Sequence, residues 1–337
     1  MKAALLYEPG NIQIKETGIV SPKNNELLIK VKIAGICGSD FHRYTGDRPV
    51  RNYPIILGHE FTGVVINVGE KVKKFKSGDR VVVIPYFPCG KCFFCISGSS
   101  NLCFERFSIG IDIPGCFAEY ITVPESGAKL VPEHVSDQQA VLTEPLAVAL
   151  RAIKKAGSLI GKKVAILGAG TIGLLILQLA KRSGAKVLLS DVIEEKLQLA
   201  SELGADIIVN VTQKNLFETV KSWSSGIGAD VVIETAGVPK TVEQAINIIR
   251  PGGKVIIAGL STEFAKISPI HIARKEIKIE GTILYVEEFE EALNLVSDNS
   301  IGLERVISHI IDLSKISEAL EIIKQNKATK ILLKMSS

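Results

Sequence analysis

The chain has 337 residues, of which 46% are hydrophobic and 23% charged, and its net charge is +4. This composition is typical of a folded protein with two domains of ordinary size and excludes a disordered chain. The low charge, carried by scattered basic residues, argues against nucleic-acid binding, and no apolar run approaches the ~18 residues that span a bilayer. The N-terminus lacks a signal-peptide pattern, so we expect a cytoplasmic protein whose thiols stay reduced.

The first 140 residues are predicted to form a β-rich domain, either barrel-like or with packed sheets. Strand-like segments alternate there with Gly, Pro and Asp turns, and little helix separates them. The predicted strands are ELLIKVKIAG (26–35), GVVINVGE (63–70), DRVVVIPY (79–86) and AEYITVP (118–124).

Candidate ligands for a catalytic metal lie in three short motifs. GICGSDFH contains Cys37, LGHEF contains His59 and Glu60, and LTEPL contains Glu144. A cysteine, a histidine and a carboxylate that leave one coordination position open are typical of catalytic zinc. Each residue also has a structural explanation, as a buried thiol, a turn residue or a helix N-cap. The pattern therefore favours a metal site without proving it.

Four of the six cysteines fall within residues 88–103, in the pattern C-x2-C-x2-C-x7-C. Reduced thiols disfavour a disulfide knot, and a ferredoxin cluster would place its next cysteine after three residues, followed by proline. Four thiolates fill the tetrahedral shell of Zn²⁺ and leave no position for a substrate. We therefore predict a structural zinc lobe at about residues 88–104. Its ligands are Cys89, Cys92, Cys95 and Cys103.

From Lys162 to about Leu284, strand-like and helix-like segments alternate. Six short strands rich in Val and Ile, joined by five crossovers, predict a doubly wound parallel sheet of the Rossmann type. The predicted strands are KVAILG (163–168), KVLLSD (186–191), DIIVN (206–210), DVVIETAG (230–237), KVIIAG (254–259) and EIKIEGTIL (276–284).

The segment LGAGTIG places Gly168, Gly170 and Gly173 in GxGxxG spacing between a predicted strand and a predicted helix. Such glycines allow a tight turn, a close approach of a pyrophosphate and close packing of helix on strand. Asp191 ends the next strand, where a carboxylate accepts the ribose hydroxyls of NAD and repels the 2′-phosphate of NADP. NAD is therefore the predicted cofactor, and a turn without ligand is the alternative. The other predicted cofactor contacts are Thr171, Ile172, Lys196, Ala236 and Gly259.

After about residue 285 the sequence returns to a helix, EEFEEALNLVSDNSIG, and ends with the strand-like KILLKM. A Rossmann module is complete after six strands, so we expect this tail to rejoin the first domain. The predicted domains are a zinc-binding catalytic domain, residues 1–147 with 284–337, and a nucleotide-binding domain, residues 148–283.

These motifs resemble those of the zinc-dependent medium-chain alcohol dehydrogenases, especially the polyol (sorbitol-type) branch. The match runs nearly end to end, through GICGSDFH, LGHEFTGVV, GDRVVV, the four-cysteine lobe, FAEY, TEPLAVAL, GAGTIGLL and ETAG. The resemblance implies a chaperonin-10-like catalytic domain, a Rossmann domain, NAD, and two zinc ions per chain, one catalytic and one structural. It also implies a homodimer or homotetramer that acts on a small-molecule alcohol, with no nucleic-acid or membrane partner.

The resemblance assigns roles to the candidate ligands. Cys37, His59 and Glu60 match the catalytic zinc ligands of the polyol branch. Glu144 matches a residue that acts on the zinc directly or through water, and we expect it to join or exchange as substrate enters. Asp40 matches a carboxylate that orients the zinc-binding histidine.

Ser39 and His42 match a relay that takes the proton from the substrate hydroxyl and passes it toward solvent. A solvated surface histidine is the alternative for His42. In the implied reaction, hydride leaves the carbinol carbon of a secondary alcohol for NAD, and the product is a ketone.

The substrate stays open among polyols, sugar alcohols and sugar acids. Arg43, Arg48 and Arg51 in HRYTGDRPVRNYP would suit a carboxylate or phosphate, although a solvated loop paired with Asp47 is the preferred explanation. Cys116 in IPGCFAEY, which we expect to be a buried thiol, is a point of resemblance to threonine dehydrogenases. L-Threonine 3-dehydrogenase is therefore the main alternative function, followed by a general alcohol dehydrogenase.

Two other classes of protein are disfavoured. A zinc-free quinone reductase of the same fold would lack Cys37, His59 and the four-cysteine lobe. A non-enzymatic nucleotide-binding protein would have no reason to keep these ligands together with Ser39 and Asp40.

Overall fold

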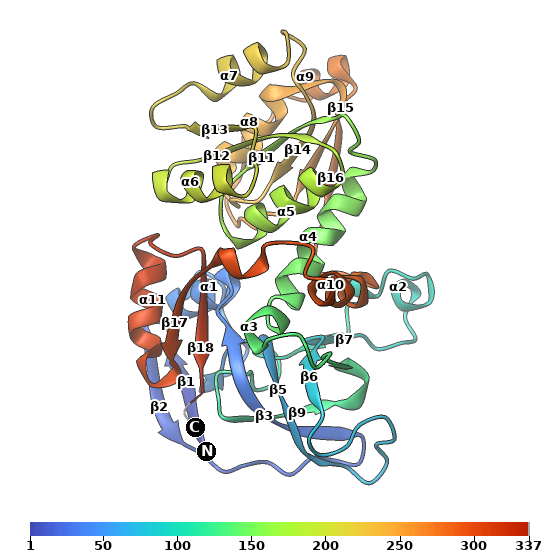
Figure 1. Cartoon of the computed structure of the whole chain (residues 1–337), viewed down its shortest axis with the longest axis vertical. Helices are drawn as coiled ribbons and strands as arrows, with labels where there is room; N and C mark the ends of the chain where they lie inside the picture. Colours follow the sequence, from blue (N-terminus) through green and yellow to red (C-terminus); the bar gives the residue numbers. More distant parts are fainter. Residues whose placement is uncertain (336–337) are drawn as a thin grey trace. The chain divides into compact units, whose positions relative to one another are not determined.

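A computed structural model describes residues 1–335 of the chain. They form two compact units: Met1–Glu144 together with the chain from Phe289 onward, and Pro145–Glu288. The first unit is thus made of two separate stretches of sequence and contains both ends of the described chain (Figure 1). The domain bounds expected from the sequence, 147/148 and 283/284, lie a few residues from these positions.

The first unit is built on a seven-stranded sheet with β3 (Glu26–Gly35) near its centre. On one side β3 pairs antiparallel with β5 (Glu60–Val68). On the other it pairs antiparallel with β9 (Tyr120–Pro124) and with β18 (Lys330–Lys334), the last strand within residues 1–335. The sheet also contains β6 (Arg80–Val83), β10 (Ala128–Leu130) and β17 (Ile307–Asp312).

Alternation along β3 builds the core of this unit. Leu27, Ile29 and Val31 are buried, as expected for one face of a strand, and they cluster with Phe61 of β5 and Leu320 of α11 (Ile316–Lys324). The remaining short strands of the unit are β1 (Lys2–Glu8), β2 (Asn11–Glu16), β4 (Ile55–Ile56), β7 (Tyr86–Phe87) and β8 (Phe107–Ser108). Its helices are α1 (Gly38–Thr45), α2 (Phe93–Ile96), α3 (Asp137–Ala140), the start of α4 (Thr143–Ala156), most of α10 (Glu288–Ser297) and α11 (Ile316–Lys324).

The second unit contains a parallel sheet of six strands in the order β13-β12-β11-β14-β15-β16. This confirms the doubly wound fold predicted from the sequence. The strand order reverses between β11 (Lys163–Leu167) and β14 (Ala229–Glu234), and ligands of such sheets bind at this switch point. The other strands are β12 (Lys186–Asp191), β13 (Ile207–Asn210), β15 (Ile249–Ile257) and β16 (Lys278–Gly281).

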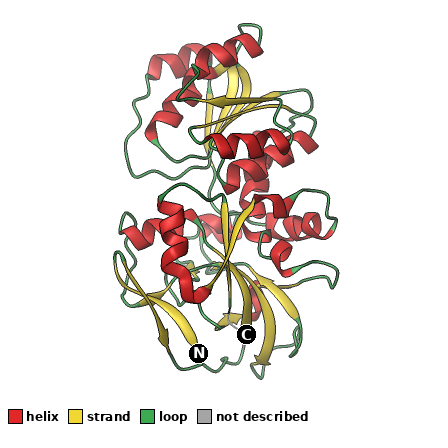
Figure 2. Cartoon of the chain, turned by 60° about the vertical axis from the view of Figure 1, so that its left-hand side comes forward, coloured by secondary structure: helices red, strands yellow, loops and turns green. Residues whose placement is uncertain are grey.

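Helices cover both faces of this sheet (Figure 2). Val164 and Ala165 lie on opposite faces of β11 and are both fully buried, as the strands of a parallel sheet should be. Ala165 belongs to a cluster that includes buried residues of α7 (Leu216–Trp223) and α8 (Pro239–Ile248). The helices of this unit are α5 (Thr171–Arg182), α6 (Glu194–Glu202), α7 (Leu216–Trp223), α8 (Pro239–Ile248) and α9 (Pro269–Lys275).

One strand differs from its predicted bounds. The sequence predicts a strand from Lys254, whereas β15 begins at Ile249 and runs through Pro251 and two glycines. Its pairing with β14 shifts register between Ala229 and Val231, and this irregularity accommodates a proline that has no N–H to donate. Within residues 1–335, no helix is long and apolar enough to cross a membrane.

Asp230 joins the N-terminal ends of three strands of the second sheet. Its Oδ1 accepts a hydrogen bond from Nε of Arg250 (2.7 Å), and its Oδ2 accepts one from the backbone N of Lys163 (2.9 Å). Partial burial acts to raise the pKa of Asp230, but these hydrogen bonds and the neighbouring positive charges outweigh it and lower the pKa. Folding therefore favours the ionised carboxylate.

Replacing Asp230 by asparagine is expected to lower the free energy of unfolding by about 1 kcal/mol near neutral pH. Because the folded pKa is depressed, this stabilisation is present above the unfolded pKa of about 3.9 and is lost as the pH falls through the folded value. The thermal unfolding midpoints of the wild-type protein and of the Asp230→Asn variant should therefore converge in acid. A difference that is the same at every pH would contradict the electrostatic explanation.

Candidate metal centres and nucleotide site

The four cysteines of the lobe converge on one point, with all four sulfur atoms within 4.8 Å of one another. Sγ of Cys95 lies 3.5 Å from Sγ of Cys92 and 4.0 Å from Sγ of Cys89, and the backbone N of Cys89 donates to Sγ of Cys103 (3.3 Å). Sulfurs around a tetrahedral Zn²⁺ are about 3.8 Å apart, so this arrangement fits a zinc site. Desolvation and the neighbouring thiols raise the pKa of Cys95 to about 12, so this thiol is protonated near neutral pH in the absence of a metal.

A second group brings together Cys37, His59 and Glu60, whose ligand atoms also lie within 4.8 Å of one another. Cys37 caps the N-terminus of α1 directly after β3, and Glu60 begins β5. Gly35 lies opposite Glu60 in the antiparallel pairing of these strands. The pairing of two neighbouring strands thus gathers a sulfur, a nitrogen and an oxygen donor, a set that suits zinc with one position left open.

Asp40 contacts two of these residues. Its Oδ2 accepts a hydrogen bond from the backbone N of Cys37 (3.0 Å), and its Oδ1 lies 3.3 Å from Nδ1 of His59. Burial acts to raise the pKa of Asp40, but the charge of His59 and these contacts lower it overall. Burial acts to lower the pKa of His59, but the charge of Asp40 raises it well above its ordinary value. With Nδ1 facing Asp40, Nε2 is the ring nitrogen available to a metal.

A buried lysine that the sequence analysis missed reaches the same group from β18. Lys330 is 2% exposed, forms an ion pair with Oε2 of Glu60, and donates a hydrogen bond from Nζ to the carbonyl O of Ile36 (3.0 Å). A Cβ at Gly35 would collide with the Glu60 carboxylate, so glycine keeps this space open. Burial acts to lower the pKa of Lys330, but the charges of Glu60 and Cys37 outweigh it and raise the pKa.

The other predicted catalytic residues lie on two helices, α1 and α4. Ser39 and His42 are three residues apart on α1 and so lie on one side of the helix. Nδ1 of His42 lies 3.2 Å from Oδ2 of Asp47, and 44% of the His42 side chain is exposed. Glu144 is buried in the first turn of α4 and is not part of the three-residue ligand group.

All three arginines considered for substrate binding interact with other residues of the chain, and Arg48 does so with Asp47. Nη1 of Arg43 donates to the carbonyl O of Ser39 (2.8 Å), and Nε of Arg51 lies 3.2 Å from Oδ1 of Asp112. Cys116 is fully buried and belongs to neither group of metal ligands.

The glycine turn joins β11 to α5. Gly168 has a φ of +111°, and a Cβ there would lie 2.8 Å from Oγ1 of Thr235. Gly170 is the N-cap of α5, and a Cβ at Gly173 would collide with the carbonyl O of Gly168. The turn therefore requires glycine and presents the N-terminal end of α5, a favourable position for phosphate.

Asp191 lies beside this turn. Its Oδ2 accepts a hydrogen bond from the backbone N of Ala169 (2.6 Å), and its Oδ1 accepts from the backbone N of Val192 (2.7 Å) and of Ile193 (3.0 Å). Three backbone donors thus fix a carboxylate at the C-terminal end of β12.

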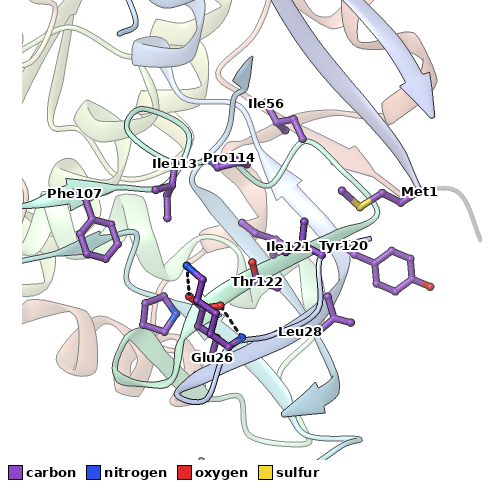
Figure 3. A pocket seen from close by; sticks show the side chains of 14 residues that line it. Met1, Glu26, Leu28, Ile56, Phe107, Ile113, Pro114, Tyr120, Ile121 and Thr122 are labelled. Atoms are coloured by element: carbon purple, nitrogen blue, oxygen red, sulfur yellow. Dashed lines mark hydrogen bonds and ion pairs between the residues drawn. The ribbon is translucent and has the colours of Figure 1, made fainter. Parts of the chain in front are cut away.

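A hollow of about 400 Å³ in the first unit is not part of these sites. Figure 3 shows that Leu28, Ile56, Ile113, Tyr120 and Thr122 contribute to its lining. None of the candidate metal ligands lines it.

Comparisons with known proteins agree with this geometry. Residues 23–133 match the alcohol dehydrogenase GroES-like domain, and residues 171–298 match the zinc-binding dehydrogenase family. Sorbitol dehydrogenase from Bacillus subtilis (strain 168) is 34% identical over 328 residues, which cover 95% of this chain and 93% of that protein. The chain therefore belongs to the zinc-binding alcohol dehydrogenase family, as predicted.

Two solved structures are similar over nearly the whole chain. The alcohol dehydrogenase rspB from Escherichia coli CFT073, complexed with NADH, has a TM-score of 0.93 and 35% identity, and covers 99% of each chain. A protein from Sinorhizobium meliloti 1021, bound to NADP, has a TM-score of 0.94 and 36% identity, and covers 99% of this chain and 98% of that one. These similar proteins thus bind different dinucleotides.

Proposed function

We propose that the protein oxidises a secondary alcohol of a polyol, sugar alcohol or sugar acid to the ketone and transfers the hydride to NAD. The observation that carries this proposal is the convergence of Cys37, His59 and Glu60, because a three-ligand set with an open position suits activation of a hydroxyl group. The similarity to a sorbitol dehydrogenase supports a polyol substrate. By analogy with the family, we also propose a homodimer or homotetramer.

The chain would hold one catalytic and one structural zinc ion. At the catalytic site, the metal would supply Lewis acidity that lowers the pKa of the substrate hydroxyl. Asp40 orients His59, Ser39 accepts the proton from the substrate hydroxyl, and His42 passes it to solvent. Glu144 provides a further buried carboxylate that joins or exchanges with Glu60 as substrate enters. The structural zinc is held by Cys89, Cys92, Cys95 and Cys103.

The preference for NAD rests on Asp191. A carboxylate fixed by three backbone N–H groups keeps its negative charge in one place, where it accepts ribose hydroxyls and repels a 2′-phosphate. The glycine turn and the first turn of α5 receive the pyrophosphate. The remaining proposed contacts are Thr171, Ile172, Lys196, Ala236 and Gly259.

Reduction of dinucleotide with a panel of substrates tests the function. The panel contains sorbitol, xylitol, threonine, aldonic acids, polyol phosphates and simple alcohols, each with NAD and with NADP. Turnover of a neutral polyol with NAD is the expected result. Turnover confined to acids or phosphates would assign a substrate role to Arg43, Arg48 and Arg51. No reduction of either dinucleotide by any alcohol would contradict the proposal.

L-Threonine 3-dehydrogenase is the second candidate function. The observation that favours it is Cys116, which stands in a motif resembling those enzymes. Turnover of threonine alone in the same panel would make it the better assignment.

A further inference from the structure

Glu234, the last residue of β14, is a fully buried carboxylate in the second unit. Its Oε1 accepts hydrogen bonds from the backbone N of Gly237 (2.8 Å) and from Oγ1 of Thr241 (2.7 Å). Its Oε2 is buried and has no hydrogen-bond partner among the described residues. Burying a carboxylate with one oxygen unsatisfied is unfavourable, so this position calls for an explanation beyond packing.

The Glu234 residue joins two loops that follow neighbouring strands. Its carbonyl O accepts a hydrogen bond from the backbone N of Gly259 (3.0 Å). A Cβ at Gly259 would lie 2.5 Å from Oε2 of Glu234 and would also collide with the backbone of Gly237. Loop 235–238 after β14 and loop 258–260 after β15 therefore pack against each other around this one side chain.

The first of these loops also contacts the glycine turn. Oγ1 of Thr235 lies 3.0 Å from the carbonyl O of Leu167 and 3.1 Å from that of Gly168, to which it donates its hydrogen bond. Because Gly168 has no side chain, Thr235 can approach this closely. The glycine turn and loop 235–238 are thus held in one fixed arrangement.

The strand order indicates which half of a dinucleotide the two loops face. β11, which leads into the glycine turn, lies between β12 and β14. Asp191, the proposed partner of the adenosine ribose, ends β12 on one side of that turn. The loops after β14 and β15 follow on the other side. A dinucleotide with its pyrophosphate at the turn and its adenosine at Asp191 must extend its second nucleoside over these loops.

We propose that Glu234 is a positioning residue that clamps loops 235–238 and 258–260 in the arrangement that receives the nicotinamide half of the cofactor. The inference rests on the proposed function. The adenosine half of the cofactor site does not depend on Glu234. Asp191 is held there by its own hydrogen bonds from the backbone N of Ala169, Val192 and Ile193.

The variant Glu234→Gln tests the clamp. Its carbonyl oxygen can still accept from Gly237 and Thr241, but its amide N–H₂ puts two donors where Oε2 lies, a buried position with no hydrogen-bond partner among the described residues. We expect NADH to bind roughly tenfold more weakly and ADP-ribose, which lacks the nicotinamide ring, to change by less than about twofold. Both affinities are measured by isothermal titration calorimetry on the full-length, zinc-loaded protein. Thr282→Val, which removes a buried hydroxyl without a partner after β16, is the matched control.

A milder pair of variants protects the test against a folding defect. Thr241→Val removes one donor to Glu234 at a half-buried helix position and should weaken NADH binding about threefold, while Thr241→Ser should restore it. Wild-type NADH affinity in Glu234→Gln, or an equal loss for NADH and ADP-ribose, would overturn the clamp. Wild-type protein that binds ADP-ribose but neither NADH nor NADPH would instead overturn the proposed function, and the clamp with it.

Discussion

Replacing Cys37 by alanine is expected to reduce turnover by more than about a hundredfold, because even the loss of a group that only supports a metal ligand reduces metal affinity or activity by 10–100-fold. The protein should also lose one of its two proposed zinc ions, leaving His59 and Glu60 as an incomplete set. NADH affinity should be unchanged, since the glycine turn and Asp191 belong to the second unit. Zinc content by mass spectrometry, turnover and NADH titration measure the three quantities.

Two other cysteine variants make the result specific. Cys95→Ser should release the other zinc ion and make the lobe at residues 88–104 sensitive to proteolysis. Cys116→Ala removes a buried thiol outside both ligand groups and should leave both ions bound. A Cys37→Ala protein that retains its activity and both zinc ions would refute the assignment of this catalytic site.

In the zinc-free protein, replacing Lys330 by methionine is expected to lower the free energy of unfolding by about 3–5 kcal/mol, since it leaves the buried carboxylate of Glu60 without a cation. It also removes the hydrogen bond to the carbonyl O of Ile36. Methionine is of similar length, so the loss reports on charge more than on volume. Equilibrium urea unfolding followed by circular dichroism gives the difference.

The control for this variant lies on the same strand. Lys334→Met replaces an exposed lysine and should change stability by no more than about 0.5 kcal/mol. The double variant Lys330→Met, Glu60→Gln removes both charges and should recover much of the lost stability. If the double variant is no more stable than Lys330→Met alone, the ion pair is not the reason for the loss.

The second unit could be predicted from local sequence because its strands are buried on both faces. KVLLSD was predicted as a strand at 186–191, and β12 has those bounds. The glycine turn is equally predictable, because close approaches at Gly168 and Gly173 admit no other residue. The motifs around Cys37 and His59 pointed to a group of residues that the structure brings together, since few residue types can bind zinc.

The tail was harder to predict because its signals are not local. β17 alternates between half-buried and exposed positions, and its sequence ISHIID carries little of the apolar pattern of a buried strand. The pairing of β18 with β3 joins segments that are about 300 residues apart, for which no sequence window contains a signal. From the sequence alone, Lys330 could not be distinguished from any other lysine of a strand. In the structure it is the buried ion-pair partner of Glu60.

The first unit is completed only when β18 pairs with β3, whereas the second unit needs no part of the tail. The second unit can therefore fold earlier during synthesis than the first. Residues 145–288 are a continuous stretch and are all available before the tail has left the ribosome. Residues 33–35 of β3, in contrast, wait for β18 as an unpaired strand edge, the kind of surface that invites pairing with another chain. Conditions that slow the end of translation should therefore favour aggregation through the first unit rather than through the second.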